Sequence, residues 1–485
     1  MVSFRFSPNP NLASQINWLP WGEAAFSKAQ TENKPVLLSI SAVWCYWCHV
    51  MDETSYSDPD VAQLINQNFV AVRVDNDHRP DLNSRYNVGG WPTTAFLTGH
   101  GGLIGGATYL PPDQFLSMLS ELRQAYEEDR ADLYDQARGL LRQRQERVGR
   151  ITAGPELEDS LPDHVARSLA GAYDAINGGF GQEPKFPNGP ILQYLVHLAR
   201  TTGEDFYRSM LVKSLDNMSS GPLYDAEEGG FFRNTGNADW TDPQREKLLE
   251  DNVILAQVYL DACSILDRED YRQVASQTID YIMASLFDKA IPGFRGSQGA
   301  HSDYFDLPAS SRMEQNRPAV DPSCYCNGNA QAVSLLLDAA WRLGRPELTA
   351  TALAVLDQLD SAAQAGQLSH VYDGSAVDDG LSFLLDWAAL LTALVDAHGC
   401  TGKEQYLDRA KAAVTEILDR FYDETGGGFF DIESKPQPIG YLRLREKPLA
   451  ENVTVAIGLL KLWQSTRDDD YKQIAETTLS SCVST

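Results

Sequence analysis

The chain has 485 residues and a formal net charge of −27, because 67 acidic side chains outnumber 40 basic ones. This charge disfavours binding to nucleic acids, whose phosphates would meet net repulsion. No run of about 18 apolar residues occurs, so no membrane-spanning helix and no membrane partner are expected. The N-terminus lacks the pattern of a secretory signal peptide, and we expect a cytoplasmic protein.

Seven cysteines, an odd number, are scattered along the chain. For a cytoplasmic protein this pattern argues against a framework of structural disulfides, and close pairs indicate redox or metal chemistry. Two close pairs occur, Cys45 with Cys48 and Cys324 with Cys326.

The N-terminal part of the chain alternates buried-strand patterns with amphipathic helical ones. Strands are predicted over residues 35–41, 69–75, 93–98 and 103–109, and helices over residues 58–66 and from 112 to about 130. The Cys45-Tyr46-Trp47-Cys48 motif follows the first strand directly, and Pro92 stands just before the third.

This order resembles the thioredoxin fold, and more narrowly the thioredoxin-like domain of the spermatogenesis-associated protein 20 family. Four stretches carry the resemblance: Trp-Cys-x-x-Cys-His-x-Met at 44–51, Asn-x-x-Phe-Val-x-Val-x-Val-Asp at 66–75, Arg-Pro-Asp-Leu at 79–82 and Gly-Gly-Trp-Pro at 89–92. The combination is more specific than a single Cys-x-x-Cys motif.

The resemblance implies that Cys45 lies at a helix N-terminus, where unpaired N–H groups and the helix dipole favour the thiolate. Cys45, the more exposed sulfur, would attack a substrate disulfide, and Cys48 would resolve the mixed disulfide. Pro92 matches the cis-proline that faces the sulfurs in this fold. These three are the predicted catalytic residues. The predicted substrate-binding residues around them are Trp44, Trp47, His49 and Trp91.

The chain departs from thioredoxins at two places. Ser39 occupies the position of their buried acid, and Tyr46 and Trp47 replace the Gly-Pro between the cysteines. Both departures indicate a different redox potential or a narrower substrate range. A zinc half-site, a haem-attachment motif and a non-redox thioredoxin fold remain alternatives. We predict no metal and no cofactor.

A Gly-Pro break at residues 152–155 places the domain boundary there, giving domains 1–150 and 151–485. The second domain is predicted to be all α, with short glycine-aromatic turns between helices. The predicted helices span residues 160–176, 189–203, 205–219, 245–268, 269–287, 326–344, 346–361, 380–399, 403–422, 448–466 and 468–482.

An internal repeat organises this second domain. The Gly-Gly-Phe-Phe of residues 229–232 recurs at 427–430, and the Glu-Lys-x-Leu-x-x-Asn-Val pattern of 246–253 recurs at 446–453. The repeat is accommodated by an (α/α)6 toroid. This arrangement of helices resembles that of the six-hairpin glycosidases and the N-acylglucosamine 2-epimerases, and the helical part of the spermatogenesis-associated protein 20 family.

In such toroids the repeated polar segments meet at one end of the ring. The substrate-binding candidates there are Glu246, Asp251, His301, His370, Glu446 and Glu451. Paired carboxylates would serve glycoside hydrolysis, and histidines would move a proton beside a sugar carbonyl. The structural alternative is that these repeated groups cap helices and tie hairpins together. Cys324 and Cys326, with His301, could also form a second redox or metal site.

The sequence thus predicts a thiol–disulfide oxidoreductase whose toroid binds a client or a carbohydrate. The predicted partners are protein disulfide clients or a small molecule such as a sugar. One alternative is a sugar epimerase or glycoside hydrolase that uses the thioredoxin domain as a redox sensor or scaffold. Another is a non-catalytic interaction protein.

Overall fold

A computed structural model describes residues 4–149, 157–158, 160–300, 302–366, 368–372 and 382–483. The chain divides into two compact units. The first contains Met1–Ala153 and Arg420–Pro448, and the second contains Gly154–Asp419 and Leu449–Val483. No helix among the described residues is both long and apolar enough to cross a membrane.

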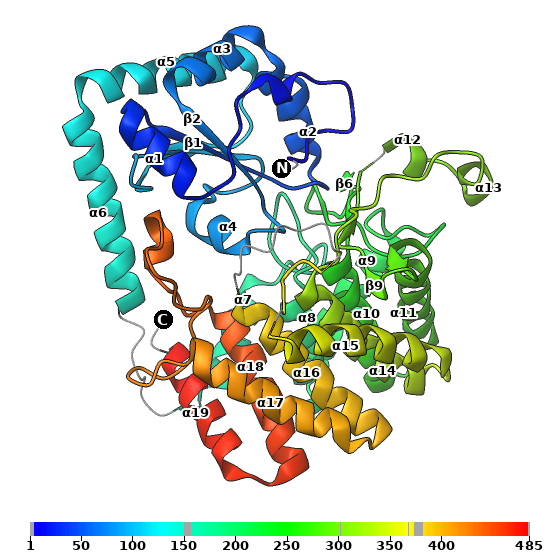
Figure 1. Cartoon of the computed structure of the whole chain (residues 1–485). Helices are drawn as coiled ribbons and strands as arrows, with labels where there is room; N and C mark the ends of the chain where they lie inside the picture. The colour runs from blue at the N-terminus through cyan, green and yellow to red at the C-terminus, as the bar shows by residue number, and fades with distance from the viewer. Residues whose placement is uncertain are drawn as a thin grey trace. The chain divides into compact units, whose positions relative to one another are not determined.

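The first unit is built on a four-stranded sheet in the order β2-β1-β3-β4 (Figure 1). Its strands are β1 (Val36–Ser41), β2 (Val70–Asp75), β3 (Thr93–Leu97) and β4 (Leu103–Ala107). The β1–β2 pair is parallel, and the β1–β3 and β3–β4 pairs are antiparallel. All four predicted strands are therefore present, within about two residues at each end.

Alternate residues of each strand face opposite sides of the sheet, and each side has its own core. Leu37, Ala71 and Phe96 pack with α2 (Tyr46–Glu53), α3 (Pro59–Asn68) and α5 (Pro112–Glu128). Their neighbours Leu38, Val72 and Ala95 pack with α1 (Glu23–Glu32) and α4 (Pro80–Tyr86). The last helix of this part, α6, spans Arg130–Gly149. The unit has the predicted thioredoxin-like fold.

The second unit consists mainly of long helices. They are α7 (Leu161–Ala172), α8 (Gly189–Thr201), α9 (Asp205–Ser220), α10 (Leu249–Leu266), α11 (Glu269–Tyr281), α14 (Cys326–Arg342), α15 (Glu347–Gln364), α16 (Leu384–Thr401), α17 (Glu404–Phe421), α18 (Leu449–Thr466) and α19 (Asp469–Val483). Two short helices, α12 (Ser302–Phe305) and α13 (Ala309–Arg312), lie between α11 and α14. Three predicted boundaries are wrong by four residues. α7 ends at Ala172 rather than 176, and α16 begins at Leu384 rather than 380. α10 begins at Leu249 rather than 245, because Pro243–Gln244 and Lys247–Leu248 form short strands.

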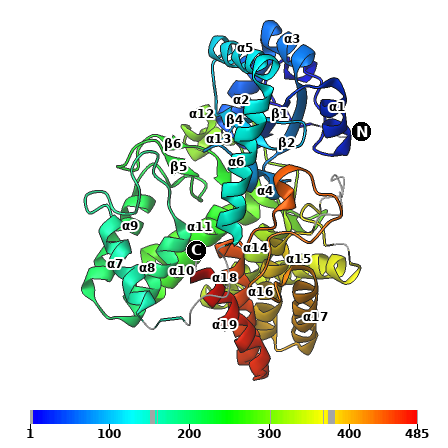
Figure 2. The same cartoon turned by 90° about the vertical axis from the view of Figure 1, so that its left-hand side faces the viewer.

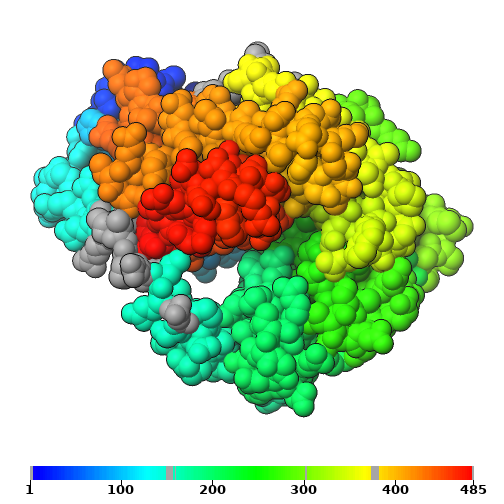
Figure 3. All heavy atoms as spheres, turned by 90° about the horizontal axis from the view of Figure 1, so that it is seen from below, coloured from blue at the N-terminus to red at the C-terminus, as the bar shows by residue number. Residues whose placement is uncertain are grey.

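Five of the described helices, α8, α10, α14, α16 and α18, pack side by side in chain order and form an inner layer. Outer helices pack against them, as the antiparallel α18 and α19 do in Figure 2. In α16, 11 of the 18 residues are buried, as expected of an inner helix. Figure 3 shows these segments in chain order from teal to red, with an opening between the teal and red ends. This is the predicted α/α toroid fold.

The repeated turns are longer than the sequence pattern first indicates, since each begins with Tyr-Asp. In every copy the aspartate accepts the N–H two residues later and pairs with a buried lysine, and two glycines follow at positive φ. The aspartate–lysine pairs are Asp174 with Lys185 (2.6 Å), Asp225 with Lys247 (2.7 Å) and Asp423 with Lys447 (2.7 Å). The repeat is therefore a structural tie between a turn and the segment that precedes an inner helix.

The repeated asparagine is also structural. Asn252 is fully buried, its Oδ1 accepts the Phe231 N–H (2.7 Å), and its Nδ2 donates to the Phe231 carbonyl (3.1 Å) and the Leu248 carbonyl (2.9 Å). Asn329 binds the N–H and the carbonyl of Phe294 in the same way. Each asparagine thus satisfies the backbone N–H and carbonyl groups of a buried phenylalanine in the turn.

We predict that Asn252→Ala lowers the free energy of unfolding of the second unit by about 2–4 kcal/mol, because buried backbone groups lose their partners. Urea unfolding followed by circular dichroism measures the change. The matched control is Asn237→Ala, at an exposed turn position, which should change stability by less than about 0.5 kcal/mol. Equal unfolding midpoints for the two variants would contradict the structural role.

Candidate functional site

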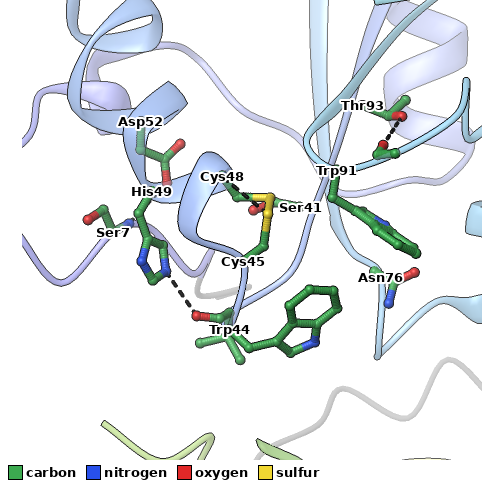
Figure 4. Close-up of a disulfide and its surroundings, with 12 residues drawn as sticks. Ser7, Ser41, Trp44, Cys45, Cys48, His49, Asp52, Asn76, Trp91 and Thr93 are labelled. Carbon is green, nitrogen blue, oxygen red and sulfur yellow. Dashed lines mark hydrogen bonds between the residues drawn. A yellow bond between two sulfur atoms is a disulfide. The ribbon is translucent and has the colours of Figure 1, made fainter. Parts of the chain in front are cut away.

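Cys45 and Cys48 form a disulfide where β1 gives way to α2 (Figure 4). Every residue of β1 is buried, so the strand is held in the sheet and delivers the motif to its carboxyl end. Cys45 is the N-cap of α2, in an extended conformation. Its Sγ accepts a hydrogen bond from the Cys48 N–H at 3.2 Å. A sulfur in this position is stabilised as an anion by the helix N-terminus.

The two sulfurs differ in access. Cys45 is 5 % exposed and Cys48 is 1 % exposed. Cys45 is the more exposed of the two, as predicted, but the access is small. A reacting molecule must therefore fit closely against the surface around Cys45.

Aromatic side chains surround the disulfide. The rings of Trp44 and Trp91 lie edge to face with centroids 5.6 Å apart. Trp44 Nε1 donates to Asp77 Oδ2 (2.8 Å), which fixes that ring. The two residues between the cysteines are outward facing: Tyr46 is 50 % exposed and Trp47 is 47 % exposed. Trp44 and Trp91 thus cover one side of the disulfide, whereas Trp47 provides an exposed apolar surface beside the motif.

The loop before β3 lies across from the disulfide in Figure 4. Its Trp91–Pro92 peptide bond is cis, as the resemblance implied. Thr93 Oγ1 donates to the Gly90 carbonyl (2.7 Å) and accepts the Val88 N–H (3.2 Å). The loop is therefore closed by its own hydrogen bonds and brings Pro92 to the start of β3, beside the carboxyl end of β1.

His49 lies on α2 with its ring directed at the Val43 carbonyl (Figure 4), and the Nε2–O distance is 2.9 Å. Burial lowers the pKa of His49, although this hydrogen bond and Asp52 oppose the change. The imidazole is therefore neutral at pH 7 and donates its Nε2 proton to the carbonyl. Burial thus disfavours a positive charge on His49 in the disulfide form of the protein.

A buried ion pair behind the motif was not predicted from the sequence. Arg73 of β2 binds Asp52 of α2 through both carboxylate oxygens at 2.8 Å, and both residues are at most 5 % exposed. Asp52 also accepts the Ser7 N–H (3.0 Å). The one available signal was a charged residue inside the apolar strand pattern of 70–75. The pair fixes α2, and with it Cys48 one turn earlier, against the sheet.

Glu246 and Glu446, the glutamates of the two repeated Glu-Lys pairs, lie in different units. Glu246 is buried beside the structural Lys247, and burial lowers the pKa of Lys247 to about 8 despite the opposing charge of Asp225. Glu446 belongs to the first unit and pairs with Arg144 (2.5 Å). The repeated Glu-Lys pairs are thus divided between the two units.

The remaining candidates have different positions. Asp251 and Glu451 lie in the first turns of α10 and α18. His370 is buried and pairs with Asp386 of α16, with 2.9 Å between Nδ1 and Oδ1. His301 lies outside the described residues.

At the N-terminal ends of three inner helices the structure joins groups that the sequence did not connect. Asn327 Nδ2 donates to Glu250 Oε1 (2.6 Å), and the Asn327 N–H donates to Asp386 Oδ1 (3.0 Å). These residues, His370 and Asp251, which interacts with the charge of the adjacent Glu250, are here called the acid–histidine cluster: Glu250, Asp251, Asn327, His370 and Asp386. The sequence prediction contained Asp251 and His370 and missed the other three, because only the fold brings α10, α14 and α16 together.

Two carboxyl groups of the acid–histidine cluster have perturbed acidity. Burial raises the pKa of Glu250, and burial together with the Glu250 charge raises that of Asp251 to about 6. Glu250 is nevertheless exposed to solvent. A carboxyl group with a pKa of about 6, as Asp251 has, can act as a general acid near neutral pH.

The second cysteine pair carries no disulfide. Cys324 and Cys326 are both buried thiols. Burial and the neighbouring Asp386 raise the pKa of Cys326 well above its ordinary value, which makes it a poor nucleophile. No group of three or more histidine, cysteine, aspartate or glutamate side chains that could hold a metal ion occurs within the described ranges.

Comparisons with known proteins match both parts of the chain. Residues 9–145 match the Thioredox_DsbH family model, described as a protein of unknown function, DUF255. The uncharacterized protein B0495.5 of Caenorhabditis elegans is 26% identical over 95% of this chain and 79% of its own length. Human spermatogenesis-associated protein 20 is 31% identical over 59% of this chain, and the match covers 39% of that protein.

A solved structure shares the fold of the helical part. The cellobiose 2-epimerase of Spirochaeta thermophila superposes with a TM-score of 0.53 at 16% identity, covering 70% of this chain and 85% of that one. At this identity the similarity concerns the fold alone.

The raised pKa of Asp251 makes stability depend on pH. An unfolded aspartate has a pKa of about 3.9. The folded protein therefore binds the Asp251 proton more tightly than the unfolded chain does. The stability that this protonated carboxyl contributes is lost as pH rises through 6. We predict that Asp251→Asn stabilises the protein more at pH 8 than at pH 5, by on the order of 1 kcal/mol. Urea unfolding at both values measures this. The exposed Asp408→Asn variant is the control, and the same pH response in both variants would contradict the assignment.

Proposed function

Because the chain is a homologue of spermatogenesis-associated protein 20 with a thioredoxin-like domain, we propose that it is a thiol–disulfide oxidoreductase acting through Cys45 and Cys48. The observation that carries the proposal is the Cys45–Cys48 disulfide at the N-terminus of α2, with the Cys48 N–H directed at Cys45 Sγ. The match covers well under half of the human relative, so the activity is proposed for this chain on its own site.

The reaction follows thiol–disulfide exchange. The Cys45 thiolate attacks one sulfur of a client disulfide; a mixed disulfide forms and the other client sulfur leaves as a thiolate. The Cys48 thiolate then attacks Cys45 Sγ, which forms the intrachain disulfide and releases the second client thiolate. Two electrons pass from the protein dithiol to the client, and the two protons of the dithiol end on the client thiols. A dithiol reductant returns the protein to its reduced form.

The surroundings of the sulfurs support a selective enzyme. Trp44 and Trp91 cover one side, so small access at Cys45 favours a client whose disulfide protrudes. Trp47 offers an exposed apolar contact beside the motif. Pro92 would present the backbone edge along which a client lies, and the neutral His49 would hold the first turn through Val43. We place the reaction in the cytoplasm, because the other five cysteines form no disulfide among the described residues.

Trapping a mixed disulfide tests this proposal. In the Cys48→Ser variant, Cys45 should form a stable mixed disulfide with a client, because nothing resolves it. Wild type should catalyse insulin reduction by dithiothreitol, and Cys45→Ser should lower the rate to the uncatalysed value. Non-reducing gels, mass spectrometry and insulin turbidity are the readouts. A wild-type rate equal to that of Cys45→Ser would exclude the activity.

The acid–histidine cluster favours a second function, chemistry on a carbohydrate in the toroid. Glu250 reaches solvent while burial raises its pKa, and Asp251 has a pKa of about 6, so both suit proton transfer to or from a sugar. Asp386 holds the His370 ring in one orientation. The fold shared with a sugar epimerase is compatible with this function.

Proton exchange at a sugar carbon tests the second function. Reducing mono- and disaccharides are incubated with the protein in D2O, and the loss of the C2 proton signal is followed by NMR, with release of monosaccharide as the readout for hydrolysis. We expect activity in wild type and a loss of at least about 100-fold in Glu250→Gln. Glu347→Gln on the outer helix α15 is the control. Failure of wild type on the whole sugar panel would contradict this function and favour a role in binding partners.

A further inference from the structure

Residues 420–448, here called the returning segment, run from the last two residues of helix α17 to the start of α18 but belong to the first unit. In that unit they contact α4, the helix that precedes the cis-proline loop. The returning segment is therefore built into the redox domain, although its chain neighbours are toroid helices.

Arg85 of α4 is the centre of this contact, and its side chain is fully buried. Nη1 pairs with Asp431 Oδ2 at 2.7 Å, and Nη2 donates to the Leu444 carbonyl at 2.7 Å. Nε donates to the Tyr441 carbonyl (3.2 Å), and Nη1 also donates to the Asp81 carbonyl of its own helix (3.1 Å). Such a set of bonds requires the planar fork of a guanidinium, which a lysine cannot supply.

The residue after Arg85 makes a second buried contact with the returning segment. The rings of Tyr86 and Tyr441 are stacked, with centroids 5.1 Å apart. Tyr86 Oη accepts the Tyr441 N–H (2.7 Å) and donates to the Gly101 carbonyl (2.8 Å). Gly440 has a φ of +58° and lies so close to Tyr86 that a side chain there would clash. The end of α4 is thus held from two sides.

From α4 the hydrogen bonds continue into the loop beside the sulfurs. Asn83 Oδ1 accepts Trp91 Nε1–H (3.1 Å) and Asn87 Nδ2–H (2.9 Å). Asn87 Oδ1 in turn accepts the N–H groups of Gly89 (2.8 Å) and Gly90 (2.9 Å). The position of Trp91 over the disulfide therefore depends on where α4 lies.

We propose that Arg85 is a positioning residue of the redox site: by binding the returning segment it holds α4, and through α4 it sets the loop that carries Trp91 and Pro92. The proposal rests on the redox function proposed above. Arg85 touches neither sulfur nor client, and it acts through the loop. A displacement of about 1 Å in such a positioning element can cost about 100-fold in rate.

The test uses the full chain with Arg85→Met, Arg85→Lys and Asp431→Asn, and with Arg138→Met as control, because Arg138 forms an exposed ion pair on α6. Two rates are measured. One is the alkylation of reduced Cys45 by iodoacetamide, read by mass spectrometry. The other is kcat and KM for insulin reduction. Thermal melting establishes that each variant is folded.

A loosened loop uncovers Cys45 but no longer seats the client. We therefore expect Arg85→Met to raise the alkylation rate about 3- to 10-fold and to lower kcat/KM for insulin about 10- to 100-fold, mainly through KM. Arg85→Lys should lie between Arg85→Met and wild type, and Arg138→Met should match wild type. A general loss of folding would instead lower kcat with the folded fraction and leave KM unchanged.

Asp431→Asn keeps the volume of the side chain and removes the negative charge that pairs with Arg85. It replaces Arg85→Met as the test variant if Arg85→Met does not fold. Wild-type values of both rates in a folded Arg85→Met or Asp431→Asn would overturn the proposal. If wild type itself reduces no insulin, the redox function fails, and the alkylation rates of the variants still decide whether Arg85 positions the loop.

Discussion

The hydrogen bond from the Cys48 N–H to Cys45 Sγ is the interaction on which the redox site depends. It makes a sulfur, rather than the usual oxygen, the N-cap of α2, so the reactive atom sits where the helix has N–H groups to offer. Two features of the first unit maintain that geometry. The buried strand β1 delivers Cys45, and the Arg73–Asp52 pair fixes α2 on the sheet.

Local patterns in the sequence were enough to predict much of this architecture. The apolar runs identified all four strands of the sheet, and the helical periodicity identified the long helices of the toroid. The cis-proline was expected at Pro92 because the flanking Gly-Gly-Trp-Pro matched a known family. These features depend on neighbours within about ten residues, which a single sequence displays.

Other features depend on residues far apart in the chain, and the sequence did not predict them. α4 has seven residues and reads as a polar stretch, yet Arg85 finds its carboxylate at Asp431. The repeated lysines suggested a polar site, but Lys247 forms an ion pair with the turn residue Asp225, which lies 22 residues earlier. Glu250 has no distinguishing sequence context; its partner Asn327 comes from another helix, 77 residues along the chain, and only folding brings the two together.

The central claim is that Cys45 is a poised nucleophile in the reduced protein. Its most direct test is alkylation of Cys45 by iodoacetamide from pH 3 to 10, read on the Cys45 peptide by mass spectrometry, with Cys48→Ser measured beside wild type. The helix N-terminus predicts an apparent pKa clearly below the ordinary cysteine value of about 8.5. A value at or above 8.5 in the native protein, or no alkylation until it unfolds, would contradict the account and leave the acid–histidine cluster of the toroid as the functional site.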